Sequence, residues 1–224
     1  MPGGFVRGLP AVRGLPAHLP ASTPSGIFHD MSKVFIHADE SCLGNQFTDR
    51  ERPGGAAVLL EYWNGKAWRR RDLWTSDPST TNNRMAIVSA ILALGALKER
   101  CVVHFASDSQ YLVKGASEWM PAWKKRGWKR KGGPIENLDL WRRLDGLIAK
   151  HHIRWAWIRG HAGDPRNEYV DGLARRAATE LSAVAEPVPS GFEDWLQRER
   201  DEKDRYLDYF EFAPPERGSS TGKP

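Results

Sequence analysis

The order of strand-like and helix-like segments constrains the fold of this chain more than any other feature. Three strand-like segments come first, at 33–38, 53–62 and 67–74, and the first of them is rich in Val, Phe and Ile. Asn64-Gly65, between the second and third, is a strong signal for a β-hairpin turn. The later segments alternate in character, with helix patterns at 83–98, 109–119, 138–150 and 166–181 and strand patterns at 102–106 and 153–158. This order predicts an α/β domain with a mixed five-stranded sheet flanked by helices.

Capping and breaking residues mark where two of these helices begin and end. Thr80 and Thr81 are typical capping residues before the helix at 83–98, whose apolar residues recur at helical spacing. Ser109 is expected to begin the next helix, and Pro121 is expected to break it because proline lacks the backbone N–H that a helix interior needs.

The chain is long enough for one domain with a tail at each end. Residues 1–30 contain five prolines and repeat Arg-Gly-Leu-Pro, which predicts a disordered extension, although a transit peptide is an open alternative. We expect the folded domain at 31–182 and a charged, partly disordered tail at 183–224, with a short helix against the domain near 192–212. Met31 directly precedes the first strand, so translation starts either there or at Met1.

Two properties of the sequence bear on where the protein resides. No apolar run reaches eighteen residues, so no transmembrane helix is expected. Cys42 and Cys101 lack the spacing of a zinc site and are expected to be reduced core thiols. Together these features predict a cytoplasmic protein, and we expect a monomer.

Positive charge is concentrated in the middle of the chain. The total is +5, while residues 1–30 carry +1 and residues 181–224 carry −4, so residues 31–180 carry +8. A basic domain favours a polyanionic partner such as nucleic acid. The same surplus of Lys and Arg could instead only keep the surface soluble, and charge alone does not decide between the two.

Three aspartates stand where elements of the predicted fold begin or end. Asp39 follows the first strand, Asp108 follows the fourth, and Asp171 lies in the first turns of the last helix. A mixed sheet can bring these positions together, and carboxylates without a positive partner would bind a hard cation such as Mg²⁺. Taken alone, each Asp could be a helix cap or a turn residue, and Asp108 before Ser109 is a plausible N-cap.

Four segments carry a resemblance to a known family. They are His37-Ala-Asp-Glu-Ser-Cys-Leu-Gly-Asn45, Thr80-Thr-Asn-Asn-Arg-Met-Ala86, Ala106-Ser-Asp-Ser-Gln-Tyr111 and Gly160-His-Ala-Gly-Asp-Pro-Arg-Asn-Glu-Tyr-Val-Asp171. In this order they resemble the active-site segments of bacterial type I ribonuclease H, and the resemblance spans residues 33 to 181. It implies a metal-dependent endonuclease that hydrolyses the RNA strand of RNA·DNA hybrids and leaves 5'-phosphomonoesters.

The resemblance also assigns roles to individual residues. Asp39, Asp108 and Asp171 match the metal-binding aspartates of the family, which imply two Mg²⁺ or Mn²⁺ ions with substrate bound. His161 matches the mobile histidine that assists proton transfer or product release, a task that suits a neutral imidazole near pH 7.

Two groups of residues match substrate contacts of the family. The first, near the scissile site, is Cys42, Gly44, Asn45, Asn82, Asn83 and Gln110, although the two Asn could equally be plain helix-start residues. The second resembles the basic protrusion that grips the DNA strand; residues 119–131 hold six bases and no acid, and the phosphate-binding candidates are Lys124, Lys125, Arg126 and Lys129. Trp119, Trp123 and Trp128 lie in the same stretch, and we expect them to pack on the domain instead of stacking on bases.

One residue departs from the family pattern at the site itself. Ala86 stands where the family has a glutamate, Glu40 stands where glycine is usual, and the turn at 46–52 is lengthened. Because consecutive strand residues point to opposite faces, Glu40 is expected to look away from Asp39. Ala86 is therefore either natural, with Glu40 or water completing the metal shell, or an engineered inactivation, or a mark of a protein that binds hybrids without cutting them. A rival of the same fold, such as a transposase or exonuclease, fits the segment 160–171 poorly.

Overall fold

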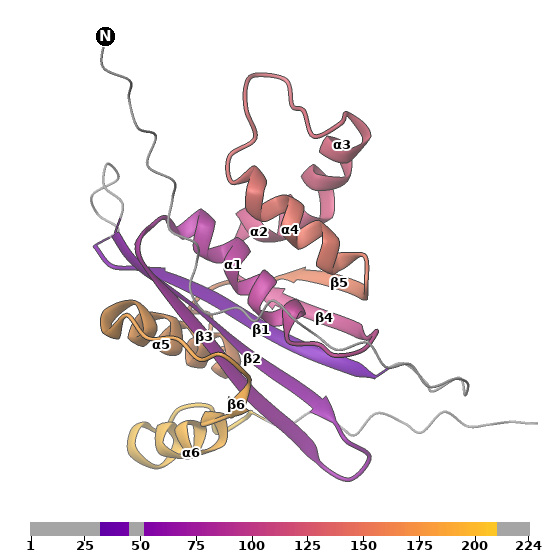
Figure 1. The fold of residues 1–224 in the computed structure, drawn as a ribbon. Helices are drawn as coiled ribbons and strands as arrows, with labels where there is room; N and C mark the ends of the chain where they lie inside the picture. The colour runs from indigo at the N-terminus through magenta and orange to yellow at the C-terminus, as the bar shows by residue number, and fades with distance from the viewer. Residues whose placement is uncertain (1–31, 45–51, 210–224) are drawn as a thin grey trace, which may run out of the picture.

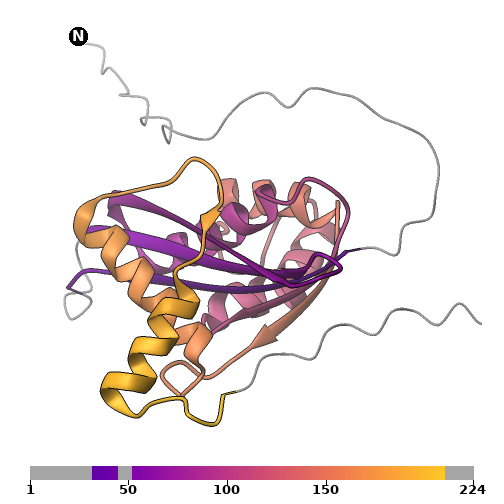
Figure 2. The same ribbon diagram turned by 90° about the horizontal axis from the view of Figure 1, so that it is seen from below.

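A twisted sheet with helices on both faces organises the chain in the computed structural model, which describes residues 32–44 and 52–209 (Figures 1 and 2). The strands are β1 (Lys33–Cys42), β2 (Arg52–Trp63), β3 (Trp68–Thr80), β4 (Val102–Ser107), β5 (His152–Trp157) and β6 (Val188–Pro189). The helices are α1 (Asn82–Gly95), α2 (Gln110–Lys114), the π-helical segment η1 (Gly115–Trp119), α3 (Met120–Lys125), α4 (Leu138–Ile148), α5 (Pro165–Glu180) and α6 (Phe192–Lys203).

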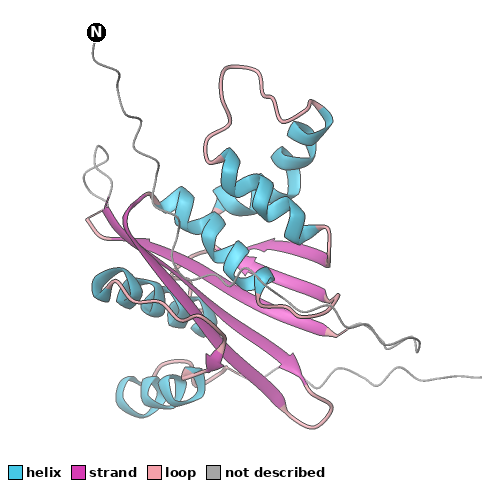
Figure 3. Ribbon diagram, viewed as in Figure 1, coloured by secondary structure: helices cyan, strands magenta, loops and turns pink. Residues whose placement is uncertain are grey.

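The sheet is mixed, and its strand order is β5-β4-β1-β2-β3-β6. Strands β1, β2 and β3 pair antiparallel, whereas β4 pairs parallel to both β1 and β5. The predicted fold class is therefore confirmed, with a sixth strand at one edge, because β6 pairs with Arg71 and Asp72 of β3 (Figure 3). The expected hairpin is also present: Asn64 Oδ1 accepts hydrogen bonds from the backbone of Lys66 (3.1 Å) and Ala67 (2.9 Å), and Gly65 takes a positive φ of 92°.

The two faces of the sheet bury different sets of residues. Val34, Ile36 and Ala38 of β1 pack in the larger core, which includes the buried side of α1 and α4. On the opposite face Ala57 and Leu59 of β2 pack against α5 and α6. Alternate residues of β1 therefore face α1 and α5 in turn, and this alternation decides where the side chains at the end of β1 point.

Helical structure continues through Pro121, where the sequence predicted a break. The chain passes from α2 through η1 into α3 without leaving the helical region of backbone conformation. The expectation is wrong because Pro121 lies in the first turn of α3, after a π-helical segment, where its missing N–H costs little. Gly115 in η1 allows close packing on α4, since a Cβ there would lie 2.2 Å from the ring of Trp141.

Residues 183–209 fold back onto the domain. Helix α6 buries Phe192 and Leu196 against α5, and Phe192 packs edge-on to Tyr169. Beneath this helix Glu61 is fully buried and accepts charge-assisted hydrogen bonds from Arg70 (2.8 Å) and Arg166 (2.5 Å). A helix in this part of the tail agrees with the expectation, while residues 1–30 and 213–224, expected to be disordered, lie outside the described residues.

Two further expectations concern the cysteines and the membrane. Cys42 and Cys101 are both free and buried, as predicted. Among the described residues, no helix combines the length and the apolar character needed to cross a lipid bilayer.

Candidate active site

Strands β1 and β4 and helix α5 bring the three predicted aspartates together. Asp39 lies near the end of β1 opposite Ala57, so its side chain is on the face that α5 covers. Asp108 follows the last residue of β4, which runs parallel to β1, and Asp171 lies on α5. Burial raises the pKa of Asp39 to about 9, and the negative charges of Asp108, Glu40 and Asp171 add to the increase. The aspartates are thus close enough to repel one another.

Asp108 is not the cap of the following helix. Ser109 is the N-cap of α2, and its side chain accepts a hydrogen bond from the backbone N–H of Leu112 (3.4 Å). The Asp108 carboxyl group is instead held against the backbone of Gly160, where a Cβ would lie 2.3 Å from Oδ2. Its carbonyl oxygen accepts a hydrogen bond from Trp157 Nε1 (3.0 Å). The carboxylate is therefore left for the acidic cluster, and the capping alternative for Asp108 is wrong.

Glu40 lies on the opposite face of β1 from Asp39, as expected, yet its carboxyl group also belongs to the acidic cluster. Burial raises its pKa to about 8, the charge of Asp108 adds to this, and a hydrogen bond with the Ser109 side chain opposes it. Its Oε2 atom is buried and has no hydrogen-bond partner in the described part of the chain. Asp108 follows the neighbouring strand β4, and the carboxyl groups of Asp39 and Glu40 both interact with it from opposite faces of β1.

The face on which Glu40 lies is the face of Ala86. Glu40 is opposite Ala56 in the β1–β2 register, and Ala56 packs against Met85 of α1. Ala86, the next residue of α1, is fully buried among apolar side chains, and its carbonyl oxygen accepts a hydrogen bond from Ser89 Oγ (2.8 Å). A carboxylate thus enters the cluster from the α1 side, supplied by the strand instead of by the helix.

The donor set fits a hard divalent cation. All neighbouring charges that shift the pKa values of Asp39 and Glu40 are negative. The Oε2 atom of Glu40 accepts no hydrogen bond from a described residue and can therefore serve as a metal ligand. Asp171 is the exception, because Arg175 donates to its Oδ2 (2.6 Å). Within residues 32–44 and 52–209, no three His, Cys, Asp or Glu side chains are packed tightly enough to enclose an ion by themselves.

His161 lies in an exposed loop between β5 and α5. Its backbone has a positive φ of 52°, and the loop ends at Asp164, whose side chain caps α5 by accepting from the backbone of Arg166 (2.9 Å) and Asn167 (3.3 Å). His161 is also near Glu168, because its charge helps to lower the pKa of that carboxyl group.

Glu168 forms a contact with the C-terminal segment that the sequence did not predict. Arg205 donates to Glu168 Oε2 and, at 3.0 Å, to Glu199 Oε2 of α6. Burial tends to raise the pKa of Glu168, but the hydrogen bonds from Tyr206 and Arg205 lower it below its usual value. No pattern in the sequence joins residue 205 to residue 168, because the contact exists only once α6 has folded back along α5.

The predicted substrate contacts near the scissile site are distributed unevenly. Gly44 is exposed with a positive φ of 72°, and Asn82, Asn83 and Gln110 are exposed at the starts of α1 and α2. The side chain of Cys42 is buried between Ala56 and Met85, so only its backbone can reach a substrate. Asn45 lies outside the described residues.

The basic residues after Trp119 form the protrusion at α3. Lys124 donates to Asp145 of α4 (2.6 Å), whereas Lys125, Arg126 and Lys129 are exposed and form no ion pair with any described residue. The tryptophans pack as expected: Trp123 is buried edge-on to Trp141, and Trp119 contacts Tyr111. Trp128 is covered by the guanidinium of Arg142. This packing leaves the Lys and Arg side chains as the part of the protrusion that is open to a ligand.

An acidic cluster where the parallel strands β1 and β4 end, on a domain that also carries a basic protrusion, is the arrangement expected of a protein that acts on nucleic acid phosphates. The sequence profile described as RNase H matches residues 31–179. A Ribonuclease H of Pseudomonas paraeruginosa is 45% identical over 153 residues, which are 68% of this chain and 97% of that protein. A Ribonuclease H of Xanthomonas campestris is 47% identical over 149 residues, 66% of this chain and 93% of that protein. The chain belongs to the ribonuclease H family.

Solved structures agree with this assignment. LC9-RNase H1, described as a type 1 RNase H with the type 2 active-site motif, superposes with a TM-score of 0.71 at 45% identity, over 78% of this chain and 84% of that one. The PFV RNase H domain has a TM-score of 0.58 at 17% identity, over 68% of this chain and 98% of that one, and supports the fold alone. The family match ends at residue 179, so β6 and α6 lie beyond the matched residues.

Proposed function

We propose that this protein is a metal-dependent endonuclease that hydrolyses the RNA strand of RNA·DNA hybrids. The observation that carries the proposal is the group of four acidic side chains, Asp39, Glu40, Asp108 and Asp171, at the ends of the parallel strands and on α5. Membership of the ribonuclease H family supplies the substrate class.

Asp39, Asp108 and Asp171 are the residues that would hold Mg²⁺ or Mn²⁺, with Glu40 as a fourth oxygen donor. A bound divalent ion supplies an activated water and stabilises the charge on the leaving oxygen. The chain's own part is to hold these carboxylates close together and, apart from Arg175 on Asp171, without basic partners, so that a cation relieves their repulsion. His161, on an exposed loop beside Glu168, is placed to carry a proton between the site and solvent.

Glu40 takes the place of the glutamate that Ala86 lacks. Its carboxylate approaches Asp108 from the sheet face covered by α1, on which Ala86 also lies. A relative at 45% identity, described as a type 1 RNase H with the type 2 active-site motif, supports the idea that this domain accommodates a rearranged set of active-site residues. Ala86 is then a natural part of a working site.

Substrate recognition is divided between two surfaces. Gly44, Asn82, Asn83 and Gln110 present small or amide groups beside the acidic cluster, where they suit contact with 2′-hydroxyls of the RNA strand. Lys125, Arg126 and Lys129 on the protrusion suit phosphates of the DNA strand.

The test is cleavage of a labelled RNA·DNA hybrid, first with Mg²⁺ and then with Mn²⁺, by the parent chain and by Asp39→Asn. Cleavage of the RNA strand by the parent and its loss in Asp39→Asn, with folding intact, would support the proposal. Full activity in Asp39→Asn would refute the metal assignment. Salt-dependent binding of the hybrid by the parent with no turnover would instead identify a catalytically silent hybrid-binding protein.

A further inference from the structure

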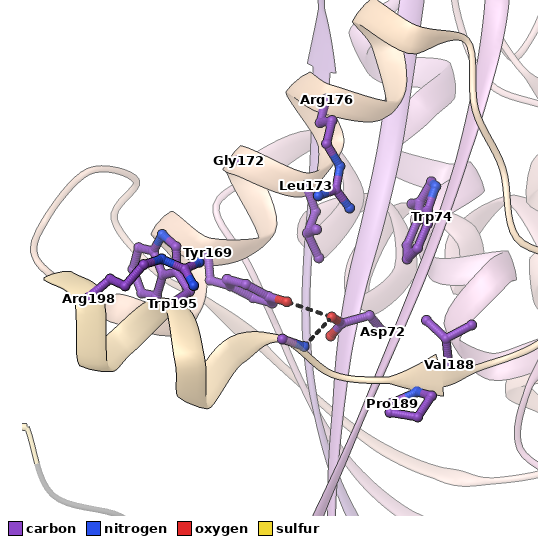
Figure 4. Close-up of a pocket in the computed structure, with 11 residues that line it drawn as sticks. Asp72, Trp74, Tyr169, Gly172, Leu173, Arg176, Val188, Pro189, Trp195 and Arg198 are labelled. Atoms are coloured by element: carbon purple, nitrogen blue, oxygen red, sulfur yellow. Dashed lines mark hydrogen bonds between the residues drawn. The ribbon is translucent and has the colours of Figure 1, made fainter.

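A cavity lies against α5, outside the acidic cluster. It has a volume of about 400 Å³ and is bounded by α5, β3, β6 and α6 (Figure 4). Small-molecule sites in proteins typically fall in the range of roughly 300 to 1,000 Å³. Val188, Pro189, Trp195 and Arg198 form one side of it and come after residue 179, where the match to the family ends. The cavity therefore exists because the C-terminal segment folds back on the domain.

A buried carboxylate with an unused oxygen forms the floor of this cavity. Asp72 is 3% exposed, and its Oδ2 accepts hydrogen bonds from the Tyr169 hydroxyl (2.6 Å) and the Gly191 backbone (3.1 Å) (Figure 4). Burial raises the pKa of Asp72, while the hydrogen bonds from Ser190, Tyr169 and Gly191 and the charge of Arg176 oppose the rise. Oδ1, by contrast, is buried and has no hydrogen-bond partner in the described part of the chain. Leaving such an oxygen without a donor is costly, so a donor from outside the chain fits here.

Two guanidinium groups stand at the rim of the cavity. Arg176 of α5 lies 5.4 Å over the ring of Trp74, and Arg198 projects from α6 beside Trp195 (Figure 4). Neither forms an ion pair within 4 Å with a described residue, although the charge of Arg176 acts on Asp72. With Asp72 as the one acid of the lining, the cavity carries an excess of positive charge, which favours an anionic group such as phosphate.

Two indole rings supply the remaining walls. Trp74 lies at one end of the cavity and Trp195 at the other, with the apolar side chains of Leu173, Val188 and Pro189 between α5 and β6 (Figure 4). Aromatic and guanidinium planes stack on nucleobases of any sequence.

We propose that this cavity is a binding site for a nucleoside monophosphate, distinct from the acidic cluster. Arg198 binds the phosphate at the Trp195 end of the cavity, the base packs against the Trp74 and Arg176 planes at the other end, and a base N–H or ribose hydroxyl donates to Asp72 Oδ1. Each of the three features satisfies a different part of one ligand, whereas a simple anion would leave Asp72 and the aromatic walls unused. The inference does not depend on cleavage of a hybrid, because none of these residues belongs to the proposed catalytic set.

The test is a calorimetric titration of the full chain in EDTA, so that no divalent ion occupies the acidic cluster. AMP, GMP, CMP and UMP are titrated separately, and inorganic phosphate is titrated as the control ligand. We expect one nucleotide to bind per chain with a Kd below about 1 mM, and phosphate to bind at least about tenfold more weakly because it lacks the ring and the donor.

Three variants make the result specific to the cavity. Arg198→Ala is expected to weaken nucleotide binding about tenfold through loss of a charge-assisted hydrogen bond. Asp72→Asn keeps the shape but presents a donor to the ligand's donor, and a similar loss is expected; thermal unfolding checks that this variant is folded. Arg143→Ala removes the same charge from an exposed position on α4 and should bind as the parent does.

Three outcomes would overturn the proposal. They are no saturable binding of any of the four nucleotides, phosphate binding as tightly as the nucleotides, or equal affinities for the parent and Arg198→Ala.

Discussion

The carboxyl group of Asp108 rests on the backbone of Gly160, so closely that a methyl group on Gly160 would meet Oδ2 at 2.3 Å. The conformation of Gly160 itself does not require glycine, because it is not among the residues with positive φ. The contact therefore links the loop after β5 directly to the acidic cluster. The Asp108 carboxylate can hold its position only because residue 160 has no side chain.

Gly160→Ala should accordingly reduce hybrid cleavage by about tenfold or more, because the added Cβ displaces the Asp108 carboxylate from its position. Steady-state rates at saturating Mg²⁺ would measure the loss. Gly146→Ala on α4 is the matched control, since a Cβ there meets nothing within 4 Å. The control should keep parental activity and gain up to about 1 kcal/mol of stability from higher helix propensity. Parental activity in Gly160→Ala would show that Asp108 tolerates the shift.

Substitutions at Glu40 and Ala86 test whether Glu40 supplies the carboxylate that α1 lacks. Glu40→Gln should lower cleavage by about a hundredfold or more, because it removes the charge that reaches Asp108 from the α1 face. Ala86→Glu should not raise activity in the parent, and it should destabilise the fold, since it places a carboxyl group in a fully buried apolar position. Cleavage assays with thermal unfolding of both variants would test this. Strong activation by Ala86→Glu would show that Glu40 does not fill the role.

The acidic cluster should make the metal-free protein less stable as pH rises. Asp39 has a folded-state pKa of about 9, above its unfolded value of 3.8, so the folded state binds the extra proton between these values. The destabilisation that comes from ionising Asp39 in the folded state is therefore absent below pH 3.8 and complete above about pH 9. In EDTA at pH 8, Asp39→Asn should therefore be more stable than the parent by at least about 1 kcal/mol, or about 2–4 °C in Tm. The difference should shrink towards pH 4 and when Mg²⁺ is added to the parent; a difference independent of pH would contradict the linkage.

The buried ion cluster around Glu61 should contribute far more to stability than an exposed ion pair. Glu61→Gln leaves the charges of Arg70 and Arg166 without their shared acid in a buried site, and a loss of about 3–5 kcal/mol in unfolding free energy is expected. Asp145→Asn breaks the pair with Lys124, whose side chain is 47% exposed, and should cost less than about 1 kcal/mol. Urea unfolding of both variants would compare them. Similar losses would mean that Glu61 is dispensable to the packing of α5 on the sheet.

The protrusion should bind hybrid by phosphate neutralisation. Replacing Lys125, Arg126 and Lys129 together by Ala should make the negative slope of log K against log salt shallower by about two to three, because each phosphate contact contributes roughly 0.9 to its magnitude. Hybrid binding by Asp39→Asn, measured at several salt concentrations with and without the triple change, would give both slopes. An unchanged slope would place the phosphate contacts elsewhere on the domain.

The order and type of the main elements could be predicted because local signals agree with the global fold. Asn64-Gly65 fixes the hairpin and Thr81 caps α1, accepting a hydrogen bond from the backbone of Arg84. The position of Glu40 could not be predicted, since strand alternation gives the face of a side chain but not what a neighbouring strand places beside it. The Arg205–Glu168 contact could not be predicted either, because it depends on how α6 packs back along α5 and not on any local sequence pattern.

Strand β6 contributes only two residues, yet its place at the edge of the sheet has a consequence for the chain as a whole. It pairs with Arg71 and Asp72 near the start of β3, where backbone groups would otherwise be open to a strand from another molecule. A fragment cut at residue 179, the end of the family match, would lose β6 and expose that edge. The C-terminal segment thus covers this edge of the sheet and prevents it from pairing with another molecule. Shortening the chain to residues 31–179 would favour aggregation.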